Sequence, residues 1–443
     1  MSINEHELAV LLARFEESPL PELVARDVRL QAAPGRADVL IGMRRSGKTY
    51  VMFQRMKELL AGGVPRGRML YLNLEDDRLG EADLEFLDRA LELFYRRRPE
   101  ARTTTAHLFF DEIHVVPGWE RFIRRVLDTE NVRICLTGSS AKLMSTEVHT
   151  SLRGRSAATE VLPFGLREAA RREEIPIPDR WPPGPRAVSR LAALVDEHLI
   201  SGGFPDVQEL HPFDRVQALQ DYVELVTLGD VVERHGVENL PALRHLVRAL
   251  FAANANSFSV SRLHGLLVSR GVRVGKATLL DYLGHLTDAY LVFLVPIRTR
   301  SEKRRIVNPR KVYSIDPGLA FAMQTGGATN TGALLENLVY LELRRRIGRR
   351  ASGAIGWYRT TGGHEVDFAV DPVQPGEVLR LYQVCADISA PDTREREVRA
   401  LSEAMTETGV PEACIVTLAG REDIVVDAGE IRVRPAWDWA LSV

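Results

Sequence analysis

The sequence is poor in cysteine, lacks long apolar runs and carries almost no net charge. Its cysteines are Cys135, Cys385 and Cys414, whose wide spacing matches no zinc or redox motif and suggests a reducing compartment. The longest apolar runs, such as residues 289–296, are too short to span a membrane. Because the N-terminus also lacks the basic start and apolar core of a signal peptide, we expect a cytoplasmic protein without membrane contact.

The charges of the chain nearly cancel. Lysine and arginine number 58 and aspartate and glutamate 60, so the formal net charge is −2. No whole-molecule field therefore favours nucleic acid, and an argument for that partner must rest on local clusters. The hydrophobic content of 45% and the charged content of 27% are those of an ordinary soluble protein, and 443 residues predict about two to four domains.

The strongest motif is a phosphate loop. Residues 42–49 read Gly-Met-Arg-Arg-Ser-Gly-Lys-Thr and fit the pattern G-x-x-x-x-G-K-[ST]. A strand-like segment, 37–41, precedes them and a helix-compatible segment, 49–60, follows, so bound phosphates would face a helix N-terminus. The predicted nucleotide-binding residues are Gly42, Arg44, Arg45, Ser46, Gly47, Lys48, Thr49 and Tyr50.

The residue types in this loop suit a nucleoside triphosphate bound with Mg²⁺. Gly42 and Gly47 allow positive φ and bring backbone N–H groups onto the phosphates. Lys48 supplies a charge for the β and γ phosphates, and the Thr49 hydroxyl can ligate the magnesium ion.

A second motif supplies two acids. The segment His107-Leu-Phe-Phe-Asp111-Glu112 is a short apolar strand that ends in two carboxylates, the order of a Walker B site. Asp111 would hold the hydrated magnesium, and Glu112 would orient and deprotonate the attacking water. A strand ending in solvated acids is common by itself, but it is unusual downstream of a phosphate loop in an α/β pattern.

Two more catalytic roles have candidates with open alternatives. The strand 132–137 runs into serines, and a hydroxyl at its end could sense the γ-phosphate. Ser139 is our choice, Thr137 the alternative, and a plain polar turn a third interpretation. Arg155 could act in trans as an arginine finger in a homo-oligomer, whereas packing on its own domain or pairing with Glu160 is the alternative.

Strand and helix signals alternate between residues 37 and 164, which predicts an α/β fold with a parallel sheet. Helical patterns then run from 187 to 235. Three short helices and two strands follow from about residue 240 and resemble a winged helix-turn-helix. The predicted domains are a P-loop nucleotide-binding core at 1–172, a helical lid at 187–237, the winged helix-turn-helix at 240–317 and an α/β restriction-endonuclease-like domain at 328–443.

The predicted β-ribbon of the winged helix is strongly basic. It carries one acid, Glu302, and seven cations: Arg298, Arg300, Lys303, Arg304, Arg305, Arg310 and Lys311. This excess of positive charge favours DNA phosphates as partner over a hairpin that is charged for solubility or a module that docks proteins.

The last predicted domain has the order helix, three strands, helix, strand, as in restriction endonucleases. Such nucleases need a carboxylate on the second strand and an acid-x-lysine pair on the third. Asp367 occupies the first position, but Gln383 and Cys385 stand where the acid and the lysine are expected. Glutamine lacks the charge that attracts a divalent cation, so Glu336 and Asp367 predict at most a weak site in a degenerate nuclease.

Together these residues resemble a prokaryotic family that joins an AAA-type ATPase domain to a C-terminal domain of unknown function with a nuclease-like end. The matching stretches are Gly42-Met-Arg-Arg-Ser-Gly-Lys-Thr49, Phe110-Asp-Glu-Ile-His114, Trp119-Glu120, Leu136-Thr-Gly-Ser-Ser140, Leu152-Arg-Gly-Arg155, Leu162-Pro-Phe164 with Glu168, Gly202-Gly-Phe-Pro205, Gly229-Asp-Val-Val-Glu-Arg234, Leu335-Glu-Asn-Leu338 and Glu365-Val-Asp-Phe368. The resemblance implies an AAA-type core, a winged helix, an endonuclease-like end and ATP as the nucleotide. Met43, where proline is common, and Gln383 and Cys385 depart from the family pattern.

The preferred hypothesis is an Mg²⁺-dependent ATPase whose nucleotide state is coupled to a DNA-bound C-terminal half. A slow nucleotide-gated switch or scaffold with a dead nuclease domain is the alternative. A third hypothesis is an ATP-regulated nuclease that uses Glu336, Glu365 and Asp367.

Overall fold

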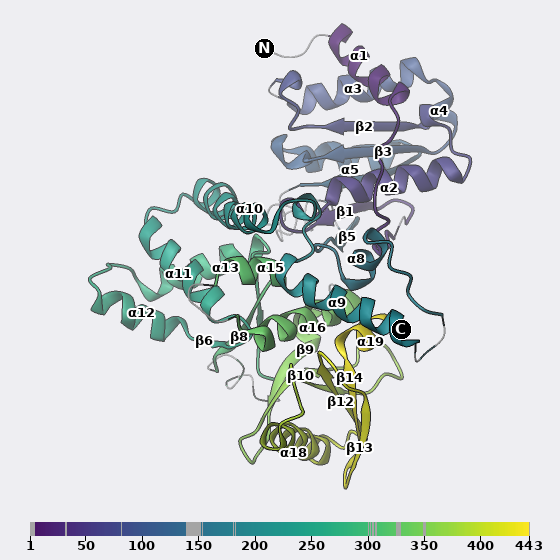
Figure 1. Cartoon of the computed structure of the whole chain (residues 1–443). Helices are drawn as coiled ribbons and strands as arrows, with labels where there is room; N and C mark the ends of the chain where they lie inside the picture. Colours follow the sequence, from purple (N-terminus) through teal and green to yellow (C-terminus); the bar gives the residue numbers. More distant parts are fainter. Residues whose placement is uncertain are drawn as a thin grey trace. The chain divides into compact units, whose positions relative to one another are not determined.

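The chain divides into two compact units, Met1–Val161 and Leu162–Val443 (Figure 1). The computed structural model describes residues 5–31, 33–80, 82–138, 152, 154–179, 181, 183–299, 301, 303, 305, 308–324, 329–348 and 351–442. Among the helices of these residues, none combines the length and the apolar character needed to cross a membrane.

The first unit is built on a parallel five-stranded sheet in the order β2-β3-β4-β1-β5. Its strands are β1 (Ala37–Ile41), β2 (Met69–Asn73), β3 (Ala106–Asp111), β4 (Val132–Thr137) and β5 (Ser156–Glu160). All residues of β1 and β3 are buried, as expected for strands covered on both faces. The predicted α/β fold with a parallel sheet is therefore confirmed. Because β4 separates β1 from β3, the carboxyl ends of these three strands meet at one edge of the sheet.

The described α-helices of the first unit precede or connect its strands. They are α1 (Glu5–Glu17), α2 (Lys48–Ala61), α3 (Leu84–Arg97), α4 (Glu100–Thr103) and α5 (Trp119–Thr129). The buried residues of α5 recur at helical spacing, at Trp119, Phe122, Ile123 and Val126. The Phe122 ring meets Phe110 of β3 edge to face, with ring centroids 5.8 Å apart, and so attaches α5 to the sheet.

The second unit begins with helices and a close backbone crossing. The helices are α8 (Leu166–Arg172), α9 (Pro185–Ser201), α10 (Pro212–Leu225), a π-helical stretch (Val226–Glu233) and α15 (Pro317–Ala322). A Cβ atom on Gly202 would lie 1.9 Å from Asp316 Oδ1, and one on Gly203 would lie 2.2 Å from the Phe164 carbonyl oxygen. The buried Asp316 carboxylate accepts hydrogen bonds from the N–H groups of Gly203 and Leu319. The Gly-Gly-Phe-Pro motif thus permits tight packing.

The middle of the second unit contains three helices and a three-stranded antiparallel sheet. In chain order the elements are α11 (Leu240–Ala252), β6 (Ser257–Phe258), α12 (Val260–Ser269), α13 (Lys276–Asp288), β7 (Val292–Val295) and β8 (Arg310–Ser314). The three predicted helices and the two predicted strands, β7 and β8, are present. The two-residue strand β6, which pairs with β8, was not predicted because it is too short for a periodic signal. The assignment as a winged helix stays a prediction.

The end of the second unit forms a six-stranded mixed sheet in the order β13-β14-β12-β11-β10-β9. Its elements are α16 (Thr331–Ile347), α17 (Ala351–Ala354), β9 (Ile355–Arg359), β10 (Glu365–Val370), β11 (Arg380–Val384), α18 (Pro391–Thr408), β12 (Glu412–Thr417), β13 (Glu422–Val426), β14 (Gly429–Pro435) and α19 (Ala436–Leu441). The predicted order of helix, three strands, helix and strand is present, followed by a hairpin and α19 that were not predicted. The register of β10 against β9 shifts between Val366 and Ala369, an irregularity that includes Asp367.

Candidate nucleotide-binding site

The phosphate-loop motif lies between β1 and α2, as its pattern predicts. A Cβ atom on Gly42 would lie 2.2 Å from the Val161 carbonyl oxygen and 3.0 Å from Ser46 Oγ, so only glycine fits there. Gly47 has φ 97° and ends the loop at the residue before α2. The left-handed conformation at Gly47 favours glycine and leaves the first N–H groups of α2 directed out of the helix end.

Lys48 and Ser46 indicate what this loop can hold. The buried Lys48 ammonium donates hydrogen bonds to the carbonyl oxygens of Gly42 and Met43, at 3.1 Å each. Ser46 Oγ is buried and has no hydrogen-bond partner in the described part of the chain. A cation, an unpaired hydroxyl and a helix N-terminus together fit a ligand with several anionic oxygens.

Asp111, at the end of β3, contacts residues from three neighbouring elements. Thr137 of β4 donates its hydroxyl to Oδ1, and Tyr71 of β2 donates to Oδ2 at 3.1 Å. A side-chain hydrogen bond also joins Asp111 to Thr49 of α2. Burial raises the pKa of Asp111 despite these hydrogen bonds. The structure therefore brings together Thr49 and Asp111, the two predicted magnesium ligands.

Glu112 directly follows β3 in a left-handed conformation, φ 54°, which is uncommon for a residue other than glycine. Its backbone N–H donates to Thr137 Oγ1 at 2.9 Å, and its Oε2 lies 3.1 Å from His114 Nδ1. Burial would raise the pKa of Glu112, but the hydrogen bond from His114 and the charge of Lys48 outweigh it and hold the pKa below its ordinary value. Glu112 is thus kept as a carboxylate, the form that a general base requires.

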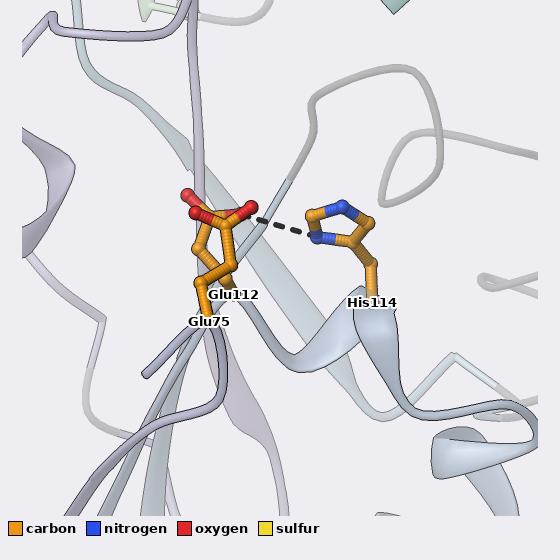
Figure 2. Close-up of side chains that lie close together, drawn as sticks. All are labelled: Glu75, Glu112 and His114. Atoms are coloured by element: carbon orange, nitrogen blue, oxygen red, sulfur yellow. Dashed lines mark ion pairs between the residues drawn. The ribbon is translucent and has the colours of Figure 1, made fainter. Parts of the chain in front are cut away.

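Glu75 completes a small cluster with Glu112 and His114. Figure 2 shows the two carboxylates beside each other, with the His114 ring directed at Glu112. One ligand atom from each residue lies within 4.8 Å of the others, a spacing that could hold a metal ion. Sequence reasoning assigned no role to Glu75 or His114, and it did not find Tyr71. The spacing of His114 from Glu112 offered only a weak signal, since the sheet order and the turn after β3 bring these groups together.

The candidates for the γ-phosphate sensor and the arginine finger have different environments. Ser139 lies outside the described residues, whereas Thr137, the alternative, contacts Asp111 and Glu112. Arg155 pairs with Asp128 on α5 rather than with Glu160, and its side chain is 42% exposed. A role for Arg155 in trans stays a prediction.

The predicted DNA-binding cations have different environments. Arg300 and Arg304 lie outside the described residues, and Lys303, Arg305 and Arg310 are exposed. Arg298 pairs with Asp371 at 2.8 Å.

The prediction that Lys311 binds DNA is wrong, because this side chain is buried and pairs with carboxylates. Successive residues of a strand point to opposite faces, so Arg310 meets solvent and Lys311 does not.

The predicted degenerate nuclease residues are mostly close together. Lys311 Nζ lies 3.0 Å from Glu336 Oε1 and 2.8 Å from Asp367 Oδ1. Gln383 Oε1 accepts from the N–H of Asp367 at 3.3 Å. Cys385 is directed instead to the carbonyl oxygen of Asp387, at 3.0 Å.

Comparison with known proteins identifies relatives of the whole chain and of its parts. Residues 35–170 match the family model of an AAA domain, and residues 192–330 match that of a domain of unknown function, DUF8612. The chain is 31% identical to an uncharacterized protein of Methanocaldococcus jannaschii over 440 residues. This alignment covers 98% of this chain and 94% of that protein. An uncharacterized protein of Haemophilus influenzae is 27% identical over 312 residues, 70% of this chain and 74% of that protein.

Solved structures resemble the chain more distantly. A Walker-type ATPase of Pyrococcus abyssi matches with a TM-score of 0.42 and 14% identity, over 73% of this chain and 96% of that one. The ORC2 protein of Aeropyrum pernix matches with a TM-score of 0.36 and 13% identity, over 77% of this chain and 93% of that one.

Proposed function

The chain belongs to the same family as the Methanocaldococcus protein, and from its AAA-type domain we propose that it is an Mg²⁺-dependent ATPase coupled to a DNA-binding C-terminal half. One observation carries the ATPase proposal. Thr49 of the phosphate-loop helix is hydrogen-bonded to Asp111 of β3. Glu112 directly follows Asp111, and the charge of Lys48 lowers the pKa of Glu112. The residues to which we give the phosphate-binding, metal-binding and general-base roles therefore share one edge of the sheet.

Each residue has a distinct role in this proposal. Lys48 leaves the carbonyl oxygens of its own loop to bind the β and γ phosphates, because phosphate oxygens are stronger acceptors for an ammonium. Thr49 and Asp111 hold Mg²⁺, which when bound neutralises charge that develops on the phosphates.

Glu112 orients the attacking water and takes its proton. Its lowered pKa keeps it deprotonated at neutral pH. Thr137 holds both acids in place from β4. ATP rather than another nucleotide is inferred from the AAA-type domain.

The test compares nucleotide binding with turnover in the full chain. Wild type should hydrolyse ATP with Mg²⁺. Lys48→Ala should abolish nucleotide binding, while Glu112→Gln should bind ATP and lose turnover. Lys57→Ala, further along α2, and Glu120→Gln, on α5, are controls that should leave both properties unchanged. Equal turnover in wild type and Glu112→Gln would reject the role of Glu112.

DNA binding is proposed for the basic segment that runs from the end of β7 to Arg310, the first residue of β8. Three helices with a sheet in the order β6-β8-β7 fit a winged helix. The exposed cations Lys303, Arg305 and Arg310 fit the phosphate backbone.

A nucleotide-gated switch is the second candidate. It is favoured by Lys311, which fills the predicted nuclease site and leaves the C-terminal end without evident chemistry of its own. DNA-stimulated turnover separates the two candidates. DNA should accelerate ATP hydrolysis about tenfold or more if the protein is an ATPase coupled to DNA, whereas a switch need not respond.

A further inference from the structure

Lys311 joins two sheets of the second unit. It belongs to β8 of the three-stranded sheet, yet its ammonium lies among carboxylates of α16 and β10. Nζ is 3.0 Å from Glu336 Oε1, 2.9 Å from Glu365 Oε1 and 2.8 Å from Asp367 Oδ1. The Lys311 side chain is only 3% exposed. A single buried cation thus connects residues that are distant in the sequence.

The ammonium is paired with all three acids. It donates hydrogen bonds to Glu336 and Asp367, and Glu365 forms an ion pair at a comparable distance. An ammonium has three donors, so three carboxylate oxygens match its capacity. This lysine is therefore committed to carboxylates, unlike the lysine that a nuclease uses in catalysis.

Other groups fix the carboxylates in place. Glu336 Oε1 also accepts from the hydroxyl of Tyr313, at 2.7 Å, and Tyr313 stacks on Tyr340. Asp367 Oδ2 accepts from the N–H of Val384 at 2.9 Å. Both carboxylate oxygens of Asp367 thus accept hydrogen bonds, Oδ1 from Lys311 and Oδ2 from Val384, and these bonds fix the carboxylate beside the ammonium.

Charge balance shows why a cation is required here. Burial alone would lower the pKa of Lys311, but Asp367, Glu336 and Glu365 together raise it. Without Lys311 the buried Asp367 carboxylate would lose the cation that lies 2.8 Å from it, and an unpaired buried charge is costly.

We propose that the Lys311 ammonium occupies the position in this cluster where a divalent metal ion would otherwise bind. It therefore prevents metal binding at the nuclease-like end, and it also connects β8 to α16 and β10. Mg²⁺ and Mn²⁺ are hard cations that select oxygen ligands such as these carboxylates. An ammonium at the centre of the carboxylates excludes such a metal ion, because it fills the position and carries a positive charge. The cluster then stabilises the second unit instead of cutting DNA. This proposal is independent of ATP hydrolysis.

The test is thermal unfolding of the full chain with and without Mn²⁺. Lys311→Met should lower Tm by about 5 °C, because it leaves the buried Asp367 carboxylate without its cation. Mn²⁺ should raise the Tm of Lys311→Met by several degrees relative to chelator, and the additional change Asp367→Asn should remove that response. Lys276→Met, an exposed lysine on α13, should change neither value.

Wild type provides a test that does not depend on the folding of Lys311→Met. Its Tm should respond to Mn²⁺ to the same extent as that of Asp367→Asn, since neither protein holds metal in this cluster. A Mn²⁺ response of wild type that Asp367→Asn abolishes would overturn the proposal. So would cleavage of plasmid by wild type with Mg²⁺ or Mn²⁺ that is lost in Asp367→Asn.

Discussion

Thr137, the last residue of β4, donates its hydroxyl to Asp111, the last residue of β3. The same hydroxyl accepts from the N–H of Glu112 at 2.9 Å. One side chain therefore positions both acids of the proposed ATPase site. Because β4 lies between β1 and β3, this residue stands at the centre of the strand ends that hold the site.

Thr137→Val should reduce ATP turnover about tenfold or more and change nucleotide affinity little. The substitution keeps the shape but removes one hydrogen bond from the buried Asp111 carboxylate and the acceptor of the Glu112 N–H, a loss of about 1–3 kcal/mol. Steady-state kinetics and nucleotide titration measure the two effects. Thr137→Ser keeps the hydroxyl and should retain most activity, so equally slow turnover in both variants would contradict the role of that hydroxyl.

Charge reversal at Arg305 and Arg310 should weaken DNA binding for every sequence tested. Each lost phosphate contact should lower the slope of log K against log salt by about 0.9, so the double variant should lose about 2 units of slope. Fluorescence anisotropy at several salt concentrations provides the measurement. Arg399→Glu, on α18, is the control. Unchanged affinity in the double variant would point to a protein partner for this segment.

Gly202→Ala should destabilise the chain by at least about 3 kcal/mol, because its Cβ would meet the buried Asp316 carboxylate as well as strain the backbone. At Gly202 φ is +68° and the predicted separation is 1.9 Å. Gly236→Ala is a control for a positive φ in open space, since its φ is +60° and nothing lies within 4 Å of its Cβ position. Urea unfolding should show a clearly larger loss for Gly202→Ala than for Gly236→Ala. Equal losses would mean that strain alone explains the glycine.

Sequence reasoning identified the parts of the proposed site that are contiguous in the chain. The phosphate loop carries glycines, a lysine and a threonine within eight residues, and Asp111 and Glu112 end a run that is apolar on both faces. Tyr71 and His114 were not assigned, because hydroxyl and imidazole groups in those positions have no distinctive pattern. Their role became visible only from the order of β2, β3 and β4 and from the turn at Glu112.

The sequence by itself determined the α/β class and the phosphate-loop chemistry, because short-range periodicity and backbone requirements are local. Tertiary structure alone decided the role of Lys311. In the sequence it is one more cation beside Arg310, and nothing local distinguishes the two. Strand β8 turns Arg310 to solvent, whereas Glu336, Glu365 and Asp367 are brought to Lys311 by helix and sheet packing over long sequence distances. The direction of a side chain on a strand depends on register, and register depends on the whole fold.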